Sequence, residues 1–125
     1  GFFKNPQPIK ETKIWMVNGK NDDASHASVC EEYGKKMKAN GADIEVTTKA
    51  GWGHGFTANY EAEYEKHLEA WHECPDYYTE ENGMPNKDVK IDKSCITYGY
   101  HVGGTNGSWN SFKGSFKKFF IKNLL

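Results

Sequence analysis

Hydrophobic residues in the first 50 positions switch between the spacing of a strand and the spacing of a helix. Residues 14–17 form a continuous apolar run that stops at Asn18-Gly19, which indicates a strand buried on both faces. Residues 44–48 alternate with polar positions and are rich in β-branched side chains, which indicates a second strand. Between them, apolar side chains recur at helical spacing at Val29, Cys30, Tyr33 and Met37. The pattern predicts a βαβ unit with two parallel strands.

The helix of this unit has sequence signals at both ends. Ser28 and Glu31 have the spacing of an N-terminal capping box, and Asn40-Gly41 supplies a C-terminal stop. Two loops, residues 19–25 and 50–56, follow the two strands. Because parallel strands end at the same edge of a sheet, we expect these loops to lie side by side.

The second half of the chain is less regular, and we expect three parts in it. Residues 73–107 are rich in Pro, Gly and acidic or amide side chains, which predicts an irregular excursion with a short extended piece at residues 96–100. Residues 108–125 predict an amphipathic final helix, and we expect the core to contain its stripe of Phe together with Trp15, Trp71 and Trp109. Ahead of the excursion, a second helix ending near residue 72 is predicted by apolar side chains at Tyr60, Tyr64, Leu68 and Trp71.

Composition restricts the partners of the expected single α/β domain. At 125 residues with 14% aromatic side chains, the chain is large enough to form one packed core. Sixteen basic and seventeen acidic residues leave a net charge of −1, so we expect no nucleic acid partner. No apolar run reaches the roughly 18 residues that a membrane-spanning helix needs, so we expect no membrane contact. The first residues include neither an initiator Met nor a signal peptide, which indicates a chain cut upstream.

The cysteines leave two arrangements open. Cys30, Cys74 and Cys95 are the three cysteines, so at least one thiol is free, and their spacing fits no Cys-x-x-Cys metal motif. A Cys74–Cys95 disulfide would close a loop of about 20 residues and stabilise the fold by roughly 3 kcal/mol. It would place the chain in the periplasm or outside the cell, whereas reduced cysteines would place it in the cytoplasm. Cys30 is expected to be a small buried hydrophobe.

An acid and an imidazole lie in the two loops at the expected sheet edge. Asp22 follows the first strand, with Asp23 as the alternative, and His54 follows the second strand between two glycines. A histidine that acts as a base needs one fixed tautomer, and a carboxylate that accepts its Nδ1–H provides this and stabilises the imidazolium. The pattern therefore predicts an Asp–His pair of the kind used in nucleophilic acyl transfer.

The two turns and the helix between them resemble the C-terminal half of the dienelactone hydrolase family of α/β-hydrolases. In that family one strand ends in a G-x-x-D turn with the triad acid, and the next ends in a G-x-x-H-x-F turn with the triad base. Asp22 and His54 fall on these positions. Weaker similarity to the extension of an exported-looking subset of the family continues after residue 73. The segments that carry the resemblance are 19–23, 30–33, 40–46, 51–56, Cys74-Pro75 and 95–104.

The resemblance implies the C-terminal portion of an α/β-hydrolase fold and a hydrolase of small esters or lactones that needs no cofactor. The chain has no G-x-S-x-G or G-x-C-x-G turn, which carries the nucleophile in such enzymes. We therefore expect the nucleophile to come from a missing N-terminal half or a second chain. The open edge strand is expected to pair with that half or with another copy, as a homo-oligomer.

Several alternatives remain open. The chain can be a non-catalytic binding or assembly module derived from the α/β-hydrolase fold, in which case Asp22 and His54 need not face each other. Trp52, beside His54, is a candidate to line a substrate pocket. His101 is expected to be structural. A metal site at His67, His72 and Cys74 is disfavoured, because their spacing is poor for a shared ligand set.

Overall fold

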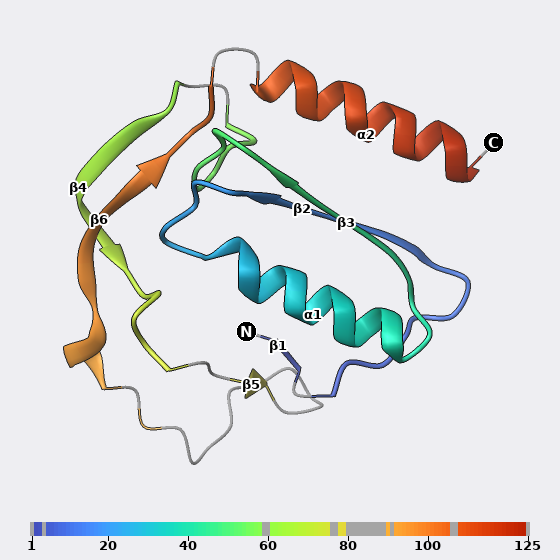
Figure 1. Cartoon of the computed structure of the whole chain (residues 1–125), viewed down its shortest axis with the longest axis horizontal. Helices are drawn as coiled ribbons and strands as arrows, with labels where there is room; N and C mark the ends of the chain where they lie inside the picture. The colour runs from blue at the N-terminus through green and yellow to red at the C-terminus, as the bar shows by residue number, and fades with distance from the viewer. Residues whose placement is uncertain are drawn as a thin grey trace.

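Strands and helices are mixed along the chain in a small α/β arrangement. The computed structural model describes residues 2–3, 5–58, 61–75, 78–79, 90, 92–105 and 108–124. Its strands form three two-stranded sheets within these ranges: β1 with β5, β2 with β3, and β4 with β6 (Figure 1). The elements are β1 (Phe2–Phe3), β2 (Lys13–Gly19), α1 (Ala27–Ala39), β3 (Asp43–Lys49), β4 (Glu63–Ala70), β5 (Tyr78–Thr79), the 3₁₀ turn η1 (Lys93–Cys95), β6 (Thr97–Val102) and α2 (Ser108–Leu124).

The predicted βαβ unit is confirmed. β2 and β3 are parallel and in register from the Lys13–Asp43 pair to the Gly19–Lys49 pair, so both strands end at the same level. Alternate side chains of a strand point to opposite faces, and those of Ile14 and Met16 on β2 pack on the α1 side. The core there is formed by Met37, Ala42 and Ile44, with Ile14, Met16, Tyr33 and Val46 packed against it.

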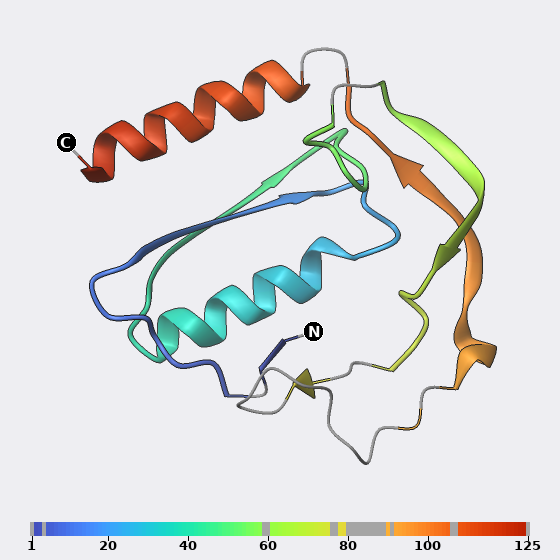
Figure 2. The ribbon, with the colours of Figure 1, turned by 180° about the vertical axis from the view of Figure 1, so that it is seen from behind.

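The predicted final helix is also confirmed, as α2, and it covers the other face of β2. Trp15 stacks on Phe112 and Phe119 of α2 at ring-centroid distances of 6.0 and 5.6 Å. In Figures 1 and 2, β2 and β3 lie between α1 and α2. The Phe stripe is only partly in this core, because Phe116 and Phe120 are 50% and 52% exposed.

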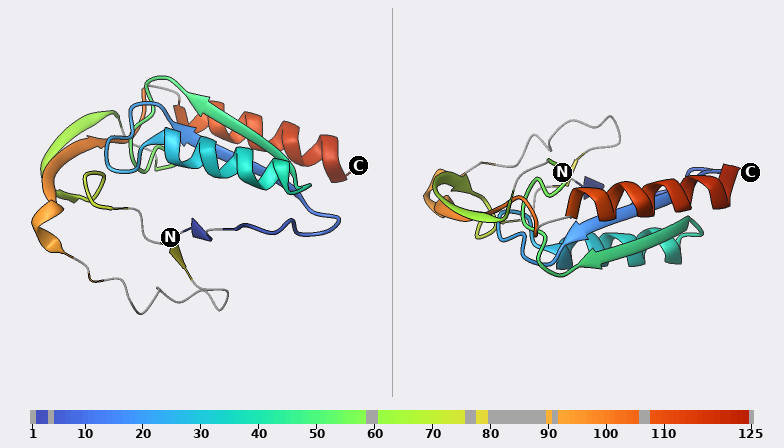
Figure 3. Two further views of the ribbon diagram at one scale, coloured as in Figure 1. Left: turned by 60° about the horizontal axis from the view of Figure 1, so that its bottom comes forward. Right: turned by 90° about the horizontal axis from the view of Figure 1, so that it is seen from above.

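The second predicted helix is wrong, because this segment forms β4. β4 pairs antiparallel with β6, from the Glu63–Val102 pair to the Ala70–Thr97 pair, with an irregularity between Glu65 and Glu69. Figure 3 shows the two strands as a ribbon at one end of the βαβ unit. Strand pairing with the β-branched and aromatic residues of β6 outweighs the helical spacing. Tyr64, Leu68 and Trp71 are 55%, 40% and 41% exposed, so they form no buried helical stripe and Trp71 is not a core residue, while Tyr60 lies outside the described residues.

The start of α1 also differs from the prediction. The helix begins at Ala27 with His26 as its N-cap, and no side chain caps it, so Ser28 and Glu31 form no capping box. Glu31 instead accepts a hydrogen bond from the Thr48 hydroxyl at 2.5 Å. The predicted end is confirmed, since Asn40 is the C-cap and Gly41 has a φ of +92°.

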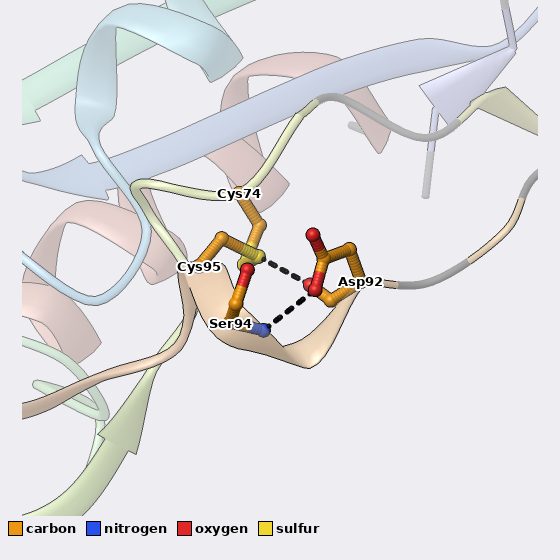
Figure 4. Close-up of a disulfide and its surroundings, with 4 residues drawn as sticks. All are labelled: Cys74, Asp92, Ser94 and Cys95. Atoms are coloured by element: carbon orange, nitrogen blue, oxygen red, sulfur yellow. Dashed lines mark hydrogen bonds between the residues drawn. A yellow bond between two sulfur atoms is a disulfide. The ribbon is translucent and has the colours of Figure 1, made fainter.

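The excursion between β4 and β6 is closed by a disulfide. Cys74 and Cys95 are bonded to each other with their Cα atoms 4.9 Å apart, and Cys30 is the free thiol, as one of the two cysteine arrangements predicted. Asp92 caps η1 by accepting a hydrogen bond from the Ser94 N–H (Figure 4). Residues 76–77, 80–89, 91 and 106–107 of the predicted excursion lie outside the described residues. In the described ranges, neither helix is long and apolar enough to cross a membrane.

Gly19 ends β2 where the chain passes closest to the turn after β3. A Cβ atom at this position would overlap the Trp52 carbonyl group, which belongs to the main chain and cannot rotate away. We expect Gly19→Ala to lower the free energy of unfolding by about 1–3 kcal/mol in urea titrations. Gly114→Ala is the control, because nothing lies within 4 Å of the added Cβ in α2 and a gain of about 0.5–1 kcal/mol is expected. Equal midpoints for the two variants would contradict the close approach.

Candidate active site

Two loops meet beyond the carboxyl ends of β2 and β3. Asn21 joins them twice: its N–H donates to the Trp52 carbonyl at 2.9 Å, and its side-chain oxygen accepts from the Gly51 N–H at 2.7 Å. The Lys20 N–H donates to the Lys49 carbonyl at 2.8 Å. Because the strands are parallel and end level, these bonds hold the loop after β2 directly against the turn after β3.

Asp22 and His54 lie opposite each other in this junction. Nδ1 of His54 is 3.1 Å from Oδ2 and 3.3 Å from Oδ1 of Asp22. Oδ1 also accepts hydrogen bonds from the N–H groups of Ala24 and Ser25, at 3.1 and 2.8 Å, which fix the carboxylate in its turn. The two side chains predicted from the sequence are therefore brought together within hydrogen-bond distance.

The orientation of His54 leaves its second nitrogen for other partners. A carboxylate only accepts hydrogen bonds, so the Asp22 contact places the proton of the neutral imidazole on Nδ1 and leaves Nε2 as the basic atom. Within the described ranges, the His54 ring makes hydrogen bonds only to Asp22. The His54 side chain is 46% exposed and that of Asp22 14%, so the acid is covered while the base is accessible. The Tyr100 ring packs edge-on against the His54 ring at 5.3 Å.

Trp52 lies next to the pair but is buried. It is 4% exposed and stacks on Phe56 at 4.6 Å. Phe56 in turn packs against Phe112 of α2 at 5.9 Å, so the turn after β3 is tied to the final helix. Packing is thus the role that Trp52 has in the described structure, and its contact with a substrate stays a prediction.

Cys30 has the character of a packing residue. Burial raises the pKa of its thiol, and the negative charges of Asp22 and Glu31 raise it further. A thiol is nucleophilic as the thiolate, and a raised pKa keeps Cys30 protonated at neutral pH. This agrees with the interpretation of Cys30 as a small hydrophobe, although it is only partly buried.

A second carboxylate–imidazole contact adjoins the first and was not predicted. Asp23, expected only as an alternative to Asp22, contacts the ring of His101, with Oδ2 2.8 Å from Nδ1. The two residues are 78 positions apart, and His101 lies on β6, so no local spacing signals their contact. The only sequence signal is the pair of adjacent Asp residues in the first loop.

Other candidate sites lie away from this junction. A groove of about 390 Å³ lies between α1 and β3 and is lined by residues that include Glu31, Lys38, Ile44 and Thr48, but neither Asp22 nor His54. Of the disfavoured metal set, Cys74 is in the disulfide. Within the described part of the chain, no three His, Cys, Asp or Glu side chains gather in an arrangement that can hold a metal ion.

Comparison with known proteins gives no relative from which the chemistry of this site could be inferred. No protein family, no curated protein and no solved structure matches the chain.

Proposed function

We propose that Asp22 and His54 are the acid and base of an acyl-transfer site that hydrolyses small carboxylic esters or lactones. The observation that carries the proposal is the contact of His54 Nδ1 with the covered Asp22 carboxylate, while the histidine side chain remains half exposed. This is the arrangement that a general base needs, with one nitrogen oriented by an acid and the other directed to the reaction. A resemblance to dienelactone hydrolases at both turns supports the choice of esters and lactones as substrates.

The proposed reaction has two acyl-transfer steps. Nε2 of His54 takes the proton of a Ser or Cys nucleophile as it attacks the acyl carbonyl, and then gives that proton to the departing alcohol oxygen. In the second step His54 takes a proton from water as it attacks the acyl-enzyme, and then gives that proton to the departing Ser or Cys, which releases the carboxylic acid. Asp22 holds the imidazole in one tautomer and stabilises the imidazolium that forms in each step.

We further propose that the nucleophile comes from outside these 125 residues. The sequence lacks the strand-to-helix nucleophile turn, and in the described residues no hydroxyl or thiol is hydrogen-bonded to the His54 ring. β2 pairs only with β3 in the described part, so its other edge has main-chain groups available for a further strand. That edge supports a docking place for the nucleophile-bearing segment.

The first measurement is a denaturing intact-mass spectrum of the native gene product that contains these residues, with hydrolysis of p-nitrophenyl acetate measured on the same sample. We expect turnover, together with a segment or second chain that carries a G-x-S-x-G or G-x-C-x-G turn. That turn is expected to be labelled by a fluorophosphonate if it holds Ser, or by iodoacetamide if it holds Cys. The separate chain of 14.2 kDa is expected to hydrolyse the ester no faster than buffer.

Two results contradict the proposal in different ways. Turnover by the 14.2 kDa chain alone that His54→Ala abolishes would show that the nucleophile lies within these residues. No turnover and no label in the native product would favour the alternative function, a non-catalytic binding or assembly module. Such a module has no need of the contact between His54 Nδ1 and Asp22, which is why the geometry favours the enzyme.

A further inference from the structure

The contact between Asp23 and His101 involves the main chain as well as the ring. Oδ1 of Asp23 accepts the His101 N–H at 2.6 Å, while Oδ2 lies 2.8 Å from Nδ1 of the same residue. A single carboxylate thus binds His101 at two atoms and ties β6 to the loop after β2. Both contacts reach across 78 positions of sequence.

The same residue of β6 holds the turn that carries His54. The His101 carbonyl accepts the His54 N–H at 2.8 Å. Two further bonds of 2.8 Å join the turn to Gly103, the residue that follows β6: the Gly53 N–H donates to the Gly103 carbonyl, and the Gly103 N–H donates to the His54 carbonyl. The approach is so close that a Cβ atom on Gly53 would lie 2.7 Å from the His101 carbonyl oxygen. The backbone position of His54 is therefore set by β6.

These contacts form a closed circuit through the candidate acid and base. Asp22 contacts the His54 ring, the His54 main chain bonds to His101, and His101 bonds to Asp23, which is covalently joined to Asp22. We propose that Asp23 and His101 are positioning residues that set the distance between Asp22 and His54. The catalytic part of this inference rests on the proposed function, whereas its structural part does not.

The side-chain directions make His101 a positioning residue and not a second base in the same site. Neighbouring side chains of a strand point to opposite faces. Tyr100 contacts the His54 ring at 5.3 Å, so His101 points away from it, toward the ring of Tyr64 at 5.1 Å.

The charge of Asp23 strengthens its hold on His101. Burial acts to raise the pKa of Asp23, but the hydrogen bonds from the His101 main chain and ring outweigh it and hold the pKa below its usual value. Asp23 is therefore ionised at neutral pH, and bonds to an ionised acceptor are stronger than neutral ones.

Amide hydrogen exchange of this chain tests the structural part. In Asp23→Ala we expect the His54 amide to exchange about 10-fold faster, because the carboxylate that accepts the His101 N–H and ties β6 to the first loop is gone. Amides of Met16 and Thr47, which donate across the β2–β3 ladder, are expected to keep their rates. Asp23→Asn keeps an oxygen for the His101 N–H and should restore most of the protection of His54. The matched control is Asp43→Ala, which removes only an exposed ion pair with Lys13 at the other end of the sheet.

A milder variant covers the case in which Asp23→Ala unfolds the chain and all amides lose protection. His101→Ala keeps both main-chain bonds and loses the ring contacts with Asp23 and Tyr64, so the His54 amide is expected to exchange about threefold faster. Unchanged exchange at His54 in His101→Ala and in any folded Asp23→Ala sample overturns the proposal, whatever the enzyme assay shows.

Kinetics of the native gene product test the catalytic part. We expect Asp23→Ala to lower kcat for p-nitrophenyl acetate about 100-fold with KM nearly unchanged, because a misplaced base affects the chemical step more than binding. Asp23→Asn is expected to recover kcat to within about 10-fold of the original. A merely structural loss would instead lower the amount of active enzyme in proportion to unfolding, and the exchange of the Met16 and Thr47 amides measures that unfolding.

The outcomes separate this inference from the proposed function. If His54→Gln abolishes turnover while folded Asp23→Ala keeps its kcat, the proposed function stands and the positioning role is wrong. If His54→Gln leaves turnover unchanged, the proposed function fails. The exchange of the His54 amide then still decides whether Asp23 holds β6 and the turn together.

Discussion

His54→Gln in the native gene product is expected to lower kcat for p-nitrophenyl acetate by about 10⁴- to 10⁶-fold, with a much smaller change in KM. Gln fills a similar volume but cannot take a proton from the nucleophile at neutral pH. Asp22→Asn is expected to cost about 10⁴-fold, because an amide can donate to Nδ1 and so favours the wrong tautomer of the imidazole. Stopped-flow and steady-state assays of the same preparations measure both effects.

The two losses are expected to be less than additive. Once His54 is gone, Asp22 has no imidazole to orient, so the double variant should be about as slow as His54→Gln alone. His67→Gln is the matched control, since His67 is an exposed histidine of β4 and is expected to leave kcat unchanged. Additive losses, or a loss in the His67 variant, would show that the substitutions act through stability and not through a shared proton transfer.

The elements around the candidate pair could be predicted because their signals are local. A continuous apolar run predicts β2, helical spacing with a terminal Asn40-Gly41 predicts α1, and alternation predicts β3. The Asp22–His54 contact could be predicted with one further step of reasoning. Two parallel strands that end at the same level place the loops that follow them side by side. No long-range contact had to be guessed beyond the βαβ unit itself.

The elements that failed depend on contacts between distant parts of the chain. Tyr64 and Leu68 have helical spacing, but β4 is formed by pairing with β6 about 30 residues later, and the Cys74–Cys95 disulfide closes the connection. The Asp23–His101 contact depends on that pairing as well, because β6 has to be in place before His101 can reach the first loop. Periodicity within a short window cannot contain this information.

Replacing Cys74 and Cys95 together by Ser is expected to lower the free energy of unfolding by about 3 kcal/mol. The disulfide spans a sequence separation of 21 residues, and without it the unfolded chain gains the entropy of an open loop. Urea titrations of the chain with and without a reductant measure the loss, and the reduced original chain should match the double variant. Cys30→Ser is the control, because it leaves the disulfide in place.

The thiol count and the exchange pattern make this prediction specific. Under denaturing conditions without reductant, one of the three cysteines should react with a thiol reagent, and all three should react after reduction. The disulfide lies just ahead of β6, and the His54 amide donates to the His101 carbonyl in β6. Loss of the disulfide is therefore expected to speed exchange of the His54 amide more than exchange of the amides in β2 and β3. A uniform increase would show that the disulfide stabilises the whole chain equally. A selective increase would show that the disulfide, by holding β6, also holds the base of the proposed site.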